Sequence, residues 1–167
     1  FDVEFSQNDI PLNRSELVTA MQRADVLVPT LNDNIDASVL AESGNQLKLL
    51  ANYGSGVDHI DVEAAHERGI LVSNSPTVSS SDTADMTIAL ILAVMRRFKE
   101  GSNVMESGDW QGWAPSAFLG TRVAGKTIGI LGMGRIGTAL AERARAFGLN
   151  VCYHNRKKVH PDTETRL

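Results

Sequence analysis

Three glycines with the spacing G-x-G-x-x-G, Gly132, Gly134 and Gly137, have the residue type and spacing of a phosphate-binding turn. They follow an apolar run, Ile128 to Leu131, that is typical of a buried parallel strand, and a helical pattern begins directly after them. The first glycine suits a tight turn, the second a close approach of backbone to a pyrophosphate, and the third close packing of helix on strand. The N–H groups of the helix N-terminus would bind the phosphates. This context predicts dinucleotide binding, and the alternative is a glycine-rich turn without a ligand.

The residues after the next apolar strand indicate which dinucleotide would bind. Residues 150–153 predict a strand that ends about 20 residues past the first glycine, where an Asp or Glu would bind the ribose hydroxyls of NAD. Here the chain instead reads His-Asn-Arg-Lys-Lys over residues 154–158. Because cations pair with a 2′-phosphate that a carboxylate would repel, NADP is the predicted cofactor, with NAD as the alternative. The predicted contacts to this phosphate are Asn155, Arg156 and Lys157 or Lys158. A solvated basic loop is the other interpretation of these residues.

Strands that alternate with short helices must position this chemistry, and they predict an α/β fold with a mainly parallel sheet. The expected strands of the first half are residues 1–5, 25–28, 47–51 and 70–72. Between them, helices are expected to begin after Asn13, which forms a capping box with Glu16, and after Asp36 and Asp61.

A break and a long apolar helix follow the last of these strands. Pro76 fixes its own backbone and keeps Ser75 out of the helical region, so residues 74–76 are the expected hinge. The helix is expected to be capped by Ser80, Ser81 or Asp82 and to run to about Phe98. Residues 86–95 are apolar nearly all round, which predicts burial between two domains. After this helix we expect a polar helix over residues 99–108 and then an irregular, Trp-rich segment over residues 109–120.

Composition narrows the classes of protein that fit. The chain has 167 residues and a formal net charge of −4, which gives no reason to expect nucleic acid or an anionic membrane as partner. Its longest apolar run is half of what a membrane span needs. The single cysteine, Cys152, excludes an internal disulfide framework and fits a reducing, cytoplasmic location. Both chain ends look cut, so we expect a fragment, and a chain that begins at Phe1 is compatible with a removed leader.

Further segments stand in an order that carries a family resemblance. They are Leu49-Leu-Ala-Asn-Tyr-Gly-Ser-Gly-Val-Asp-His-Ile-Asp61, Gly69-Ile-Leu-Val-Ser-Asn-Ser-Pro76, Asp82-Thr-Ala-Asp85 with its apolar helix, Gly108-Asp-Trp-Gln-Gly-Trp113 and Tyr153-His-Asn-Arg156. Together with the glycines they resemble the D-isomer-specific 2-hydroxyacid dehydrogenases, most closely the glyoxylate/hydroxypyruvate reductase branch. The resemblance implies a flavodoxin-like substrate-binding domain over residues 1–76, incomplete at its N-terminus. It also implies a Rossmann dinucleotide-binding domain over residues 77–167, incomplete at its C-terminus.

The resemblance also implies roles for individual residues. The amides of Ser55 and Gly56, in the loop of residues 53–57, would bind the substrate carboxylate, and a plain strand-end turn is the alternative. Thr83 would reach the cofactor from the start of the long helix, or would bond to local backbone instead. Leu31 is a candidate for the pocket wall. Inside the glycine motif, the residues that would contact the pyrophosphate are Arg135 and Ile136.

The reaction of the family is hydride transfer from NADPH or NADH to a small 2-oxo acid, such as glyoxylate or hydroxypyruvate, giving the 2-hydroxy acid. Its catalytic Arg, Glu and His lie after the first βαβ unit of the dinucleotide domain, so the resemblance places them beyond Leu167. None of the histidines in the chain has a Glu and an Arg plausibly around it; they are His59, His66, His154 and His160. We therefore assign no catalytic residue and no metal site.

Competing interpretations remain open at this point. The same fold serves as a dinucleotide-sensing, co-repressor-like regulator, and a fragment that folds poorly is a third possibility. The family resemblance implies a homodimer formed through the long helix and the Trp-rich segment. In that arrangement Trp113 would lie near the active site of the partner subunit, and packing at an interface or core is the alternative role.

Overall fold

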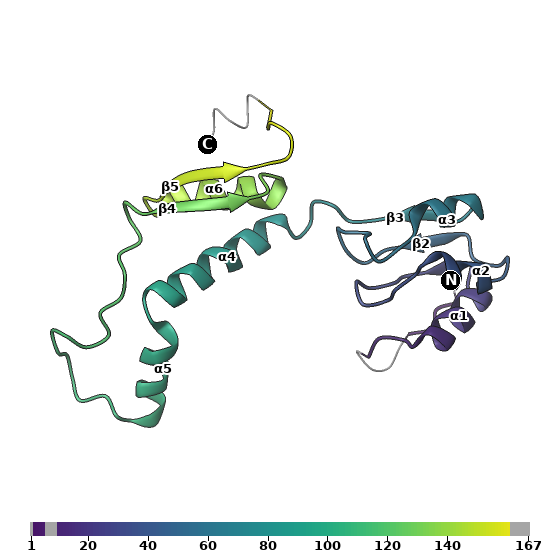
Figure 1. The fold of residues 1–167 in the computed structure, drawn as a ribbon. Coiled ribbons are helices and arrows are strands. Elements are labelled where there is room, and N and C mark those ends of the chain that lie inside the picture. The colour runs from purple at the N-terminus through teal and green to yellow at the C-terminus, as the bar shows by residue number, and fades with distance from the viewer. Residues whose placement is uncertain (1, 6–9, 161–167) are drawn as a thin grey trace. The chain divides into compact units, whose positions relative to one another are not determined.

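The computed structural model describes residues 2–5 and 10–160, which belong to two compact units, Phe1–Val78 and Ser79–Leu167 (Figure 1). Both units combine helices with parallel strands, as the alternating pattern of the sequence predicts. The predicted domain boundary after Pro76 is two residues from this division. The roles assigned to the two domains stay predictions.

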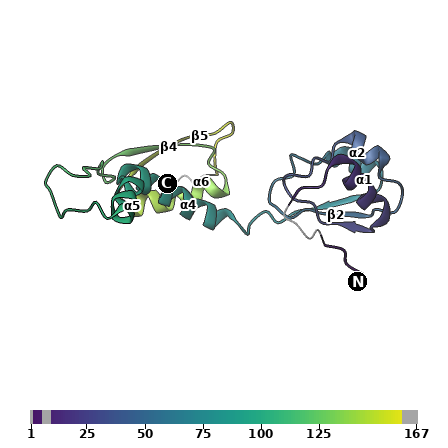
Figure 2. The same ribbon diagram turned by 90° about the horizontal axis from the view of Figure 1, so that it is seen from below.

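The first unit has a parallel sheet with the strand order β1-β2-β3, covered by short helices (Figure 1, purple to blue). Its strands are β1 (Val26–Leu27), β2 (Leu49–Ala51) and β3 (Leu71–Ser73), and its helices are α1 (Arg14–Arg23), α2 (Ala37–Glu42) and α3 (Val62–Glu67). Leu50 pairs with Leu27 on one side and with Val72 on the other, so β2 is the central strand. Figure 2 shows α1 beside α2, two helices that are in contact.

Buried apolar side chains from the helices, the strands and the loops hold this unit together. The fully buried ones include Met21, Ile35, Leu40 and Leu50. Each such side chain contributes about 1.5–3 kcal/mol relative to an exposed one. The sheet and its helices therefore form a core that fixes the loops at the strand ends.

The predicted helix starts of the first unit are confirmed. The Asn13 side chain accepts a hydrogen bond from the Glu16 amide, and the Glu16 side chain accepts one from the Asn13 amide, which is a capping box. Asp36 caps α2 by accepting a hydrogen bond from the Val39 amide, and Asp61 caps α3 by accepting one from the Ala64 amide. Each cap satisfies an amide that the first helical turn leaves without an acceptor.

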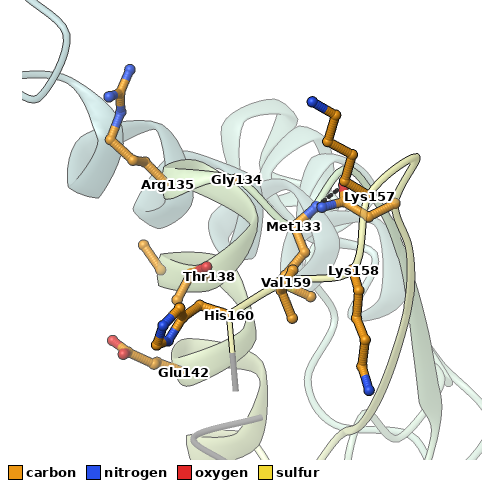
Figure 3. Close-up of a pocket in the computed structure, with 11 residues that line it drawn as sticks. Met133, Gly134, Arg135, Thr138, Glu142, Lys157, Lys158, Val159 and His160 are labelled. Atoms are coloured by element: carbon orange, nitrogen blue, oxygen red, sulfur yellow. Dashed lines mark hydrogen bonds between the residues drawn. The ribbon is translucent and has the colours of Figure 1, made fainter. Parts of the chain in front are cut away.

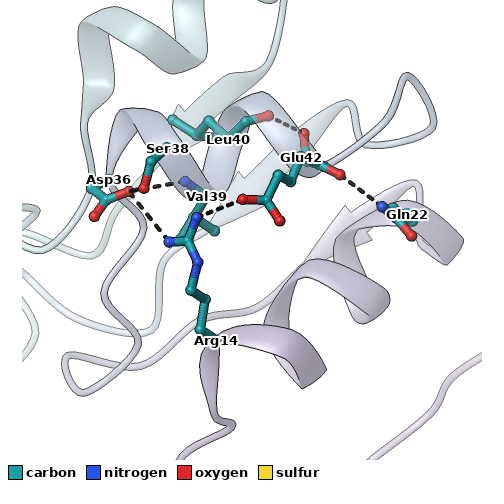
Figure 4. Close-up of polar contacts among 8 residues, drawn as sticks. Arg14, Gln22, Asp36, Ser38, Val39, Leu40 and Glu42 are labelled. Atoms are coloured by element: carbon teal, nitrogen blue, oxygen red, sulfur yellow. Dashed lines mark hydrogen bonds and ion pairs between the residues drawn. The ribbon is translucent and has the colours of Figure 1, made fainter.

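Polar contacts at the surface join α1 to α2 (Figure 4). The Arg14 guanidinium lies 2.7 Å from the Glu42 carboxylate and 3.8 Å from Asp36, and the Gln22 amide donates to the Glu42 carbonyl at 2.7 Å. The Ser38 hydroxyl, followed by the Val39 amide, lowers the pKa of the Asp36 carboxyl below its ordinary value. The Arg14 and Gln22 contacts therefore link α1 to the two ends of α2.

The second unit has β4 (Thr127–Leu131) and β5 (Asn150–His154) as a parallel pair, with α6 (Arg135–Ala146) as the connection between them. Its other helices are α4 (Ser80–Met95) and α5 (Phe98–Ser107). Helix α6 packs on α4 and on the strands. The core of this contact is apolar and includes Ala84, Ile88, Ile130, Ala141 and Ala144. No helix among the described residues has both the length and the apolar composition needed to cross a membrane.

The expected strand over residues 1–5 is not present where the structure describes it. Residues 2–5 lie outside any strand, and residue 1 lies outside the described residues. Alternation of apolar and polar residues does not form a strand without a neighbour to receive its hydrogen bonds. Glu4 instead forms an exposed ion pair with Arg23 at 2.6 Å.

The long helix differs from its prediction at both ends. Its N-cap is Ser79, whose side chain makes no capping bond, whereas the predicted caps Ser80, Ser81 and Asp82 lie inside the helix. Its C-terminal end comes at Met95 rather than Phe98, because Arg97 has a left-handed backbone with φ of 57° and starts a separate helix, α5.

Within the second unit, residues 86–95 are buried on one face only, and their predicted burial between two domains stays a prediction. Ala84 and Ile88 are buried against α6, but Met86, Leu90 and Val94 are 60%, 59% and 78% exposed. These three side chains follow one another at four-residue steps, so they form a stripe on one helix face. Apolar composition predicted a buried helix, but the described neighbours contact one face of α4.

Candidate functional site

The glycine turn, residues 132–137, joins β4 to α6 and has geometry that requires glycine. Gly132 has φ of +99°, which other residues rarely adopt, and its amide donates to the His154 carbonyl of β5 at 2.9 Å. A Cβ on Gly137 would lie 2.2 Å from the Gly132 carbonyl oxygen, closer than any real contact. The missing side chain therefore lets α6 begin directly against the turn.

The N-terminus of α6 opens at this turn without a side-chain cap. Its N-cap is Gly134, which has no side chain to accept from the first-turn amides. These include the amides of Arg135 and Ile136, which have no acceptor within the helix by its geometry. A twelve-residue helix ending at Ala146 adds its dipole to these donors. The arrangement suits an anion such as a pyrophosphate.

A hollow of about 530 Å³ lies between the glycine turn, α6 and the segment after β5 (Figure 3). It is lined by residues of all three elements: Met133, Gly134, Arg135, Thr138, Ala139, Glu142, Asn155, Lys157, Lys158, Val159 and His160. A neighbouring hollow of about 730 Å³ is lined by Leu131, Gly132 and residues 154–157. Asn155, Arg156 and Lys157 therefore lie in the walls beside the glycine turn, as the predicted NADP contacts would have to.

Asn155 has a specific contact within these walls. Its Oδ1 accepts a hydrogen bond from the Met133 amide at 3.0 Å, so it joins the end of β5 to the glycine turn. The side-chain oxygen of Asn155 is therefore already used in binding the turn. A contact from this residue to a phosphate would therefore use its Nδ2 group, because only that end of the amide donates.

Thr83 lies in the first turn of α4, where its hydroxyl donates to the Ser79 carbonyl at 2.7 Å. This is the local backbone bond that was the alternative to a cofactor contact. The hydroxyl oxygen can still accept, so the predicted cofactor contact stays a prediction.

An ionic contact holds the N-terminal half of α4 against α6. The Arg143 guanidinium pairs with Asp85 and also donates to the Ser81 hydroxyl at 2.7 Å and to the Ala139 carbonyl at 2.9 Å. The hydrogen bond from Arg143 is the main reason that the pKa of the Asp85 carboxyl is below its ordinary value. This contact fixes the helix that carries Thr83 relative to the glycine turn.

The loop of residues 53–57, called the β2 loop, follows the carboxyl end of the central strand of the first unit. Open parallel sheets bind ligands at this edge. The Gly54 carbonyl accepts from the Ser75 amide at 2.9 Å, and the Ser55 hydroxyl donates to the Ser75 carbonyl at 2.9 Å. A Cβ on Gly54 would lie 3.0 Å from Leu31 Cδ2, so the candidate pocket-wall residue is beside the predicted carboxylate-binding residues.

Two groups of contacts were missed by reasoning from the sequence. One is the set of side chains behind the β2 loop, in which Asn52 and Asn74 bind backbone carbonyls. The other is the contact of Arg143 with Asp85. The sequence did contain a signal for the first group, because Asn52 and Asn74 each directly follow an apolar strand. The second joins residues far apart in the sequence and gave no local signal.

The described residues hold no group of three or more His, Cys, Asp or Glu side chains placed to bind a metal ion. Of the histidines considered in the sequence, His59 contacts Asn52, His66 lies in α3, and His154 ends β5. His160 lines the hollow of about 530 Å³ and points toward the side of α6 that bears Glu142 (Figure 3). The absence of a catalytic residue from this chain stays a prediction.

Comparisons with known proteins agree on one family. Residues 1–158 match the model of the family described as D-isomer specific 2-hydroxyacid dehydrogenase, catalytic domain. A Staphylococcus aureus (strain USA300) protein named "Putative 2-hydroxyacid dehydrogenase" is 44% identical over 95% of this chain and 50% of its own length. The chain thus spans about half the length of such curated relatives.

Solved structures resemble the chain in fold as well. The TT0316 protein from Thermus thermophilus is 48% identical with a TM-score of 0.84, over 90% of this chain and 48% of that protein. A glyoxylate reductase from Paecilomyes thermophila is 33% identical with a TM-score of 0.77, over 91% of this chain and 48% of that one.

The cofactors named with solved relatives differ from one relative to another. A D-lactate dehydrogenase from Aquifex aeolicus, complexed with NAD and lactic acid, is 26% identical with a TM-score of 0.77, over 89% of this chain and 44% of its own. An acyclic imino acid reductase in complex with NADPH and D-Arg is 28% identical with a TM-score of 0.79, over 91% of this chain and 48% of its own. Relatives therefore bind NAD or NADPH.

Proposed function

Because the chain belongs to the D-isomer specific 2-hydroxyacid dehydrogenase family, we propose that the protein transfers a hydride from NADPH to a small 2-oxo acid. Glyoxylate and hydroxypyruvate are the proposed substrates, and the product is the 2-hydroxy acid. The first unit would be a flavodoxin-like substrate domain, and the second the first part of a Rossmann domain. The dinucleotide, when bound, supplies the hydride, and the residues of this chain bind and orient both reactants.

The cofactor proposal rests on one observation: cationic side chains at the end of β5 line the same hollows as the glycine turn. Arg156 and Lys157 line hollows that also contain residues of the turn. Their charges would pair with the 2′-phosphate that distinguishes NADP from NAD. The β5 end has no carboxylate over residues 154–158 to bind a free ribose hydroxyl. NAD is the alternative cofactor.

In the proposed complex each site binds one anionic group. The amides of the glycine turn and of α6 would hold the pyrophosphate, and those of Ser55 and Gly56 would hold the substrate carboxylate. Such contacts act by positioning, because they bring the carbonyl carbon of the 2-oxo acid toward the hydride donor. The proton for the new hydroxyl would come from a residue outside this chain.

The test is turnover by the full-length protein with NADPH and a series of acceptors. Glyoxylate and hydroxypyruvate should be reduced, whereas glycolaldehyde, which lacks a carboxylate, should be a poor substrate because the β2 loop has no anion to bind. Equal rates with glycolaldehyde would contradict the role of the loop. Binding of NADPH without turnover of any acceptor would contradict the reductase and favour a dinucleotide-sensing regulator.

The proposed assembly is a homodimer in which the stripe Met86, Leu90 and Val94 of α4 is covered by a second copy. These side chains and Trp113, which is 83% exposed, are apolar surface of the kind that interfaces bury. Leu90→Glu should shift the full-length protein from dimer to monomer in sedimentation. An unchanged dimer would show that its interface lies elsewhere.

A further inference from the structure

The β2 loop is held from behind by two asparagine side chains that bind its carbonyl oxygens. Asn52 Nδ2 donates to the Gly54 carbonyl at 3.2 Å and to the Gly56 carbonyl at 2.8 Å. Asn74 Nδ2 donates to the Ser55 carbonyl, between those two, at 2.7 Å. Three consecutive peptide carbonyls are thus bound by side chains that lie at the ends of β2 and β3.

The direction of these carbonyls fixes the direction of the amides. The peptide bonds of the loop are trans, so each C=O points opposite to the N–H of the following residue. The amides of Ser55, Gly56 and Val57 therefore point away from the asparagine groups that bind the preceding carbonyls. Within the described residues, these amides have no protein acceptor. Successive outward N–H groups form a concavity that binds anions.

Asn52 is itself held in one orientation. The residue is 3% exposed, and its backbone N–H donates to the Ser73 carbonyl of β3 at 2.9 Å. Its side-chain Oδ1 lies 3.0 Å from His59 Nε2. Because Nδ2 is used as the donor to two carbonyls, the oxygen must face His59 and can only accept. His59 therefore carries a proton on Nε2, and this contact prevents the Asn52 amide from flipping.

We propose that Asn52 and Asn74 are positioning residues, which turn the amides of the β2 loop toward the carboxylate of the substrate. His59 acts one step further back, by fixing the Asn52 amide. This inference rests on the proposed function, because it assigns the substrate carboxylate to the loop. Neutral amides suit the task, since a Lys or Arg at either position would compete with the loop for the anion.

Removal of either asparagine should weaken substrate binding more than chemistry. In the full-length protein, Asn52→Ala and Asn74→Ala should raise KM for glyoxylate about ten-fold, the size expected for lost hydrogen bonds that orient the loop. The carboxylate is bound equally in the ground and transition states, so kcat should change less than about three-fold. KM for NADPH should not change, because the dinucleotide would bind the other unit.

Two substitutions of His59 separate positioning from packing. His59→Gln keeps a side-chain N–H that can donate to Asn52 Oδ1, whereas His59→Leu removes the donor and keeps a side chain of comparable bulk. We expect KM for glyoxylate to stay close to wild type in His59→Gln and to rise several-fold in His59→Leu. Equal values in the two variants would contradict the role given to His59.

Asn13→Ala is the matched control, because it removes an asparagine that caps α1 in the same unit, away from the β2 loop. It should lower the thermal midpoint without changing either KM. If Asn52→Ala and Asn74→Ala changed KM no more than this control, the positioning role would be wrong.

A second measurement keeps this result separate from the proposed function. Binding of oxamate, a carboxylate mimic of a 2-oxo acid, is measured by calorimetry with the NADPH-loaded wild type and with Asn52→Ala. Wild-type binding that the variant loses supports the positioning role, even if turnover is absent and the reductase proposal fails. Equal affinity in the two proteins overturns the positioning role, whatever the activity.

Discussion

The glycine turn of the second unit and the β2 loop of the first unit present backbone amides in two different ways. In the turn, the amides are exposed because side chains are missing: Gly134 has none to cap α6, and Gly137 leaves room for the Gly132 carbonyl. In the β2 loop, the amides are oriented by neighbouring side chains, since Asn52 and Asn74 bind the loop carbonyls. The first proposed anion site thus depends on missing side chains, and the second depends on side-chain hydrogen bonds to the loop.

The difference predicts which substitutions each site tolerates. An added methyl group should disrupt the glycine turn. Loss of an asparagine side-chain amide should instead disrupt the β2 loop. The turn should fail for every dinucleotide at once, and the loop should fail for the carboxylate substrate alone. The following variants test this contrast from its largest expected effect to its smallest.

Gly137→Ala should have the largest effect. Its Cβ would lie 2.2 Å from the Gly132 carbonyl, so the turn and α6 must separate, at a cost of about 1–3 kcal/mol in the free energy of unfolding. Binding of both NADPH and NADH, measured by fluorescence titration, should fall more than ten-fold.

The matched control for this change is Gly101→Ala in α5, where an added Cβ meets nothing within 4 Å. This variant should be more stable by about 0.5–1 kcal/mol, because alanine favours a helix interior. Full dinucleotide affinity in Gly137→Ala would contradict the geometry described for the turn.

Removal of the cations after β5 should affect one cofactor only. The double variant Arg156→Ala, Lys157→Ala should raise KM for NADPH by about 10- to 100-fold, because charge-assisted contacts to the 2′-phosphate are worth about 1.5–3 kcal/mol. KM for NADH should change less than about two-fold. A similar loss for both dinucleotides would mean that these residues support the loop rather than select the phosphate.

Asn155 should give a smaller effect that distinguishes its two roles. Asn155→Ala removes the bond to the Met133 amide and should weaken binding of both dinucleotides by about five-fold for one hydrogen bond, with a larger loss for NADPH, which would also lose its contact with Nδ2. Asn155→Asp keeps an acceptor for Met133 but adds a negative charge, so it should weaken NADPH and spare NADH. A loss confined to NADPH in Asn155→Ala would contradict the positioning of the turn by this residue.

The contact of Asp85 with Arg143 should give the smallest effect, visible as a pH dependence. The pKa of Asp85 is lowered in the folded state, so its stabilising contribution is present above the unfolded value of about 3.9 and is lost as pH falls through the lower, folded value. The thermal midpoint of the wild type should therefore exceed that of Asp85→Asn at neutral pH. The two midpoints should converge as pH falls below the folded-state pKa of Asp85, and parallel curves would contradict the contact.

The same contrast explains what the sequence made predictable. The helix caps and the glycine turn follow from short-range rules about residue type, and the structure has Asn13, Asp36 and Asp61 in their predicted places. The network behind the β2 loop depends on strands β2 and β3 being neighbours, which brings Asn74 beside Ser55. Local patterns do not contain such pairings.

The ends of the long helix were mispredicted for a related reason. Apolar composition gives the tendency of a segment to be buried but not the partner that covers it, and the described neighbours of α4 leave Met86, Leu90 and Val94 exposed. Its end at Met95 depends on the left-handed backbone of Arg97, a conformation that the residue type does not favour. The guanidinium of Arg97 lies 5.7 Å from the Phe118 ring centroid, a contact made by residues distant in sequence.

The most direct test of the account is the ratio of kcat/KM for NADPH to that for NADH, measured on the full-length protein with glyoxylate as acceptor. We predict a ratio well above ten, because Arg156 and Lys157 line the wall beside the glycine turn where a 2′-phosphate would be bound. A ratio below one would contradict the cofactor assignment without contradicting the fold or the two proposed anion sites. No turnover with either dinucleotide would contradict the reductase itself.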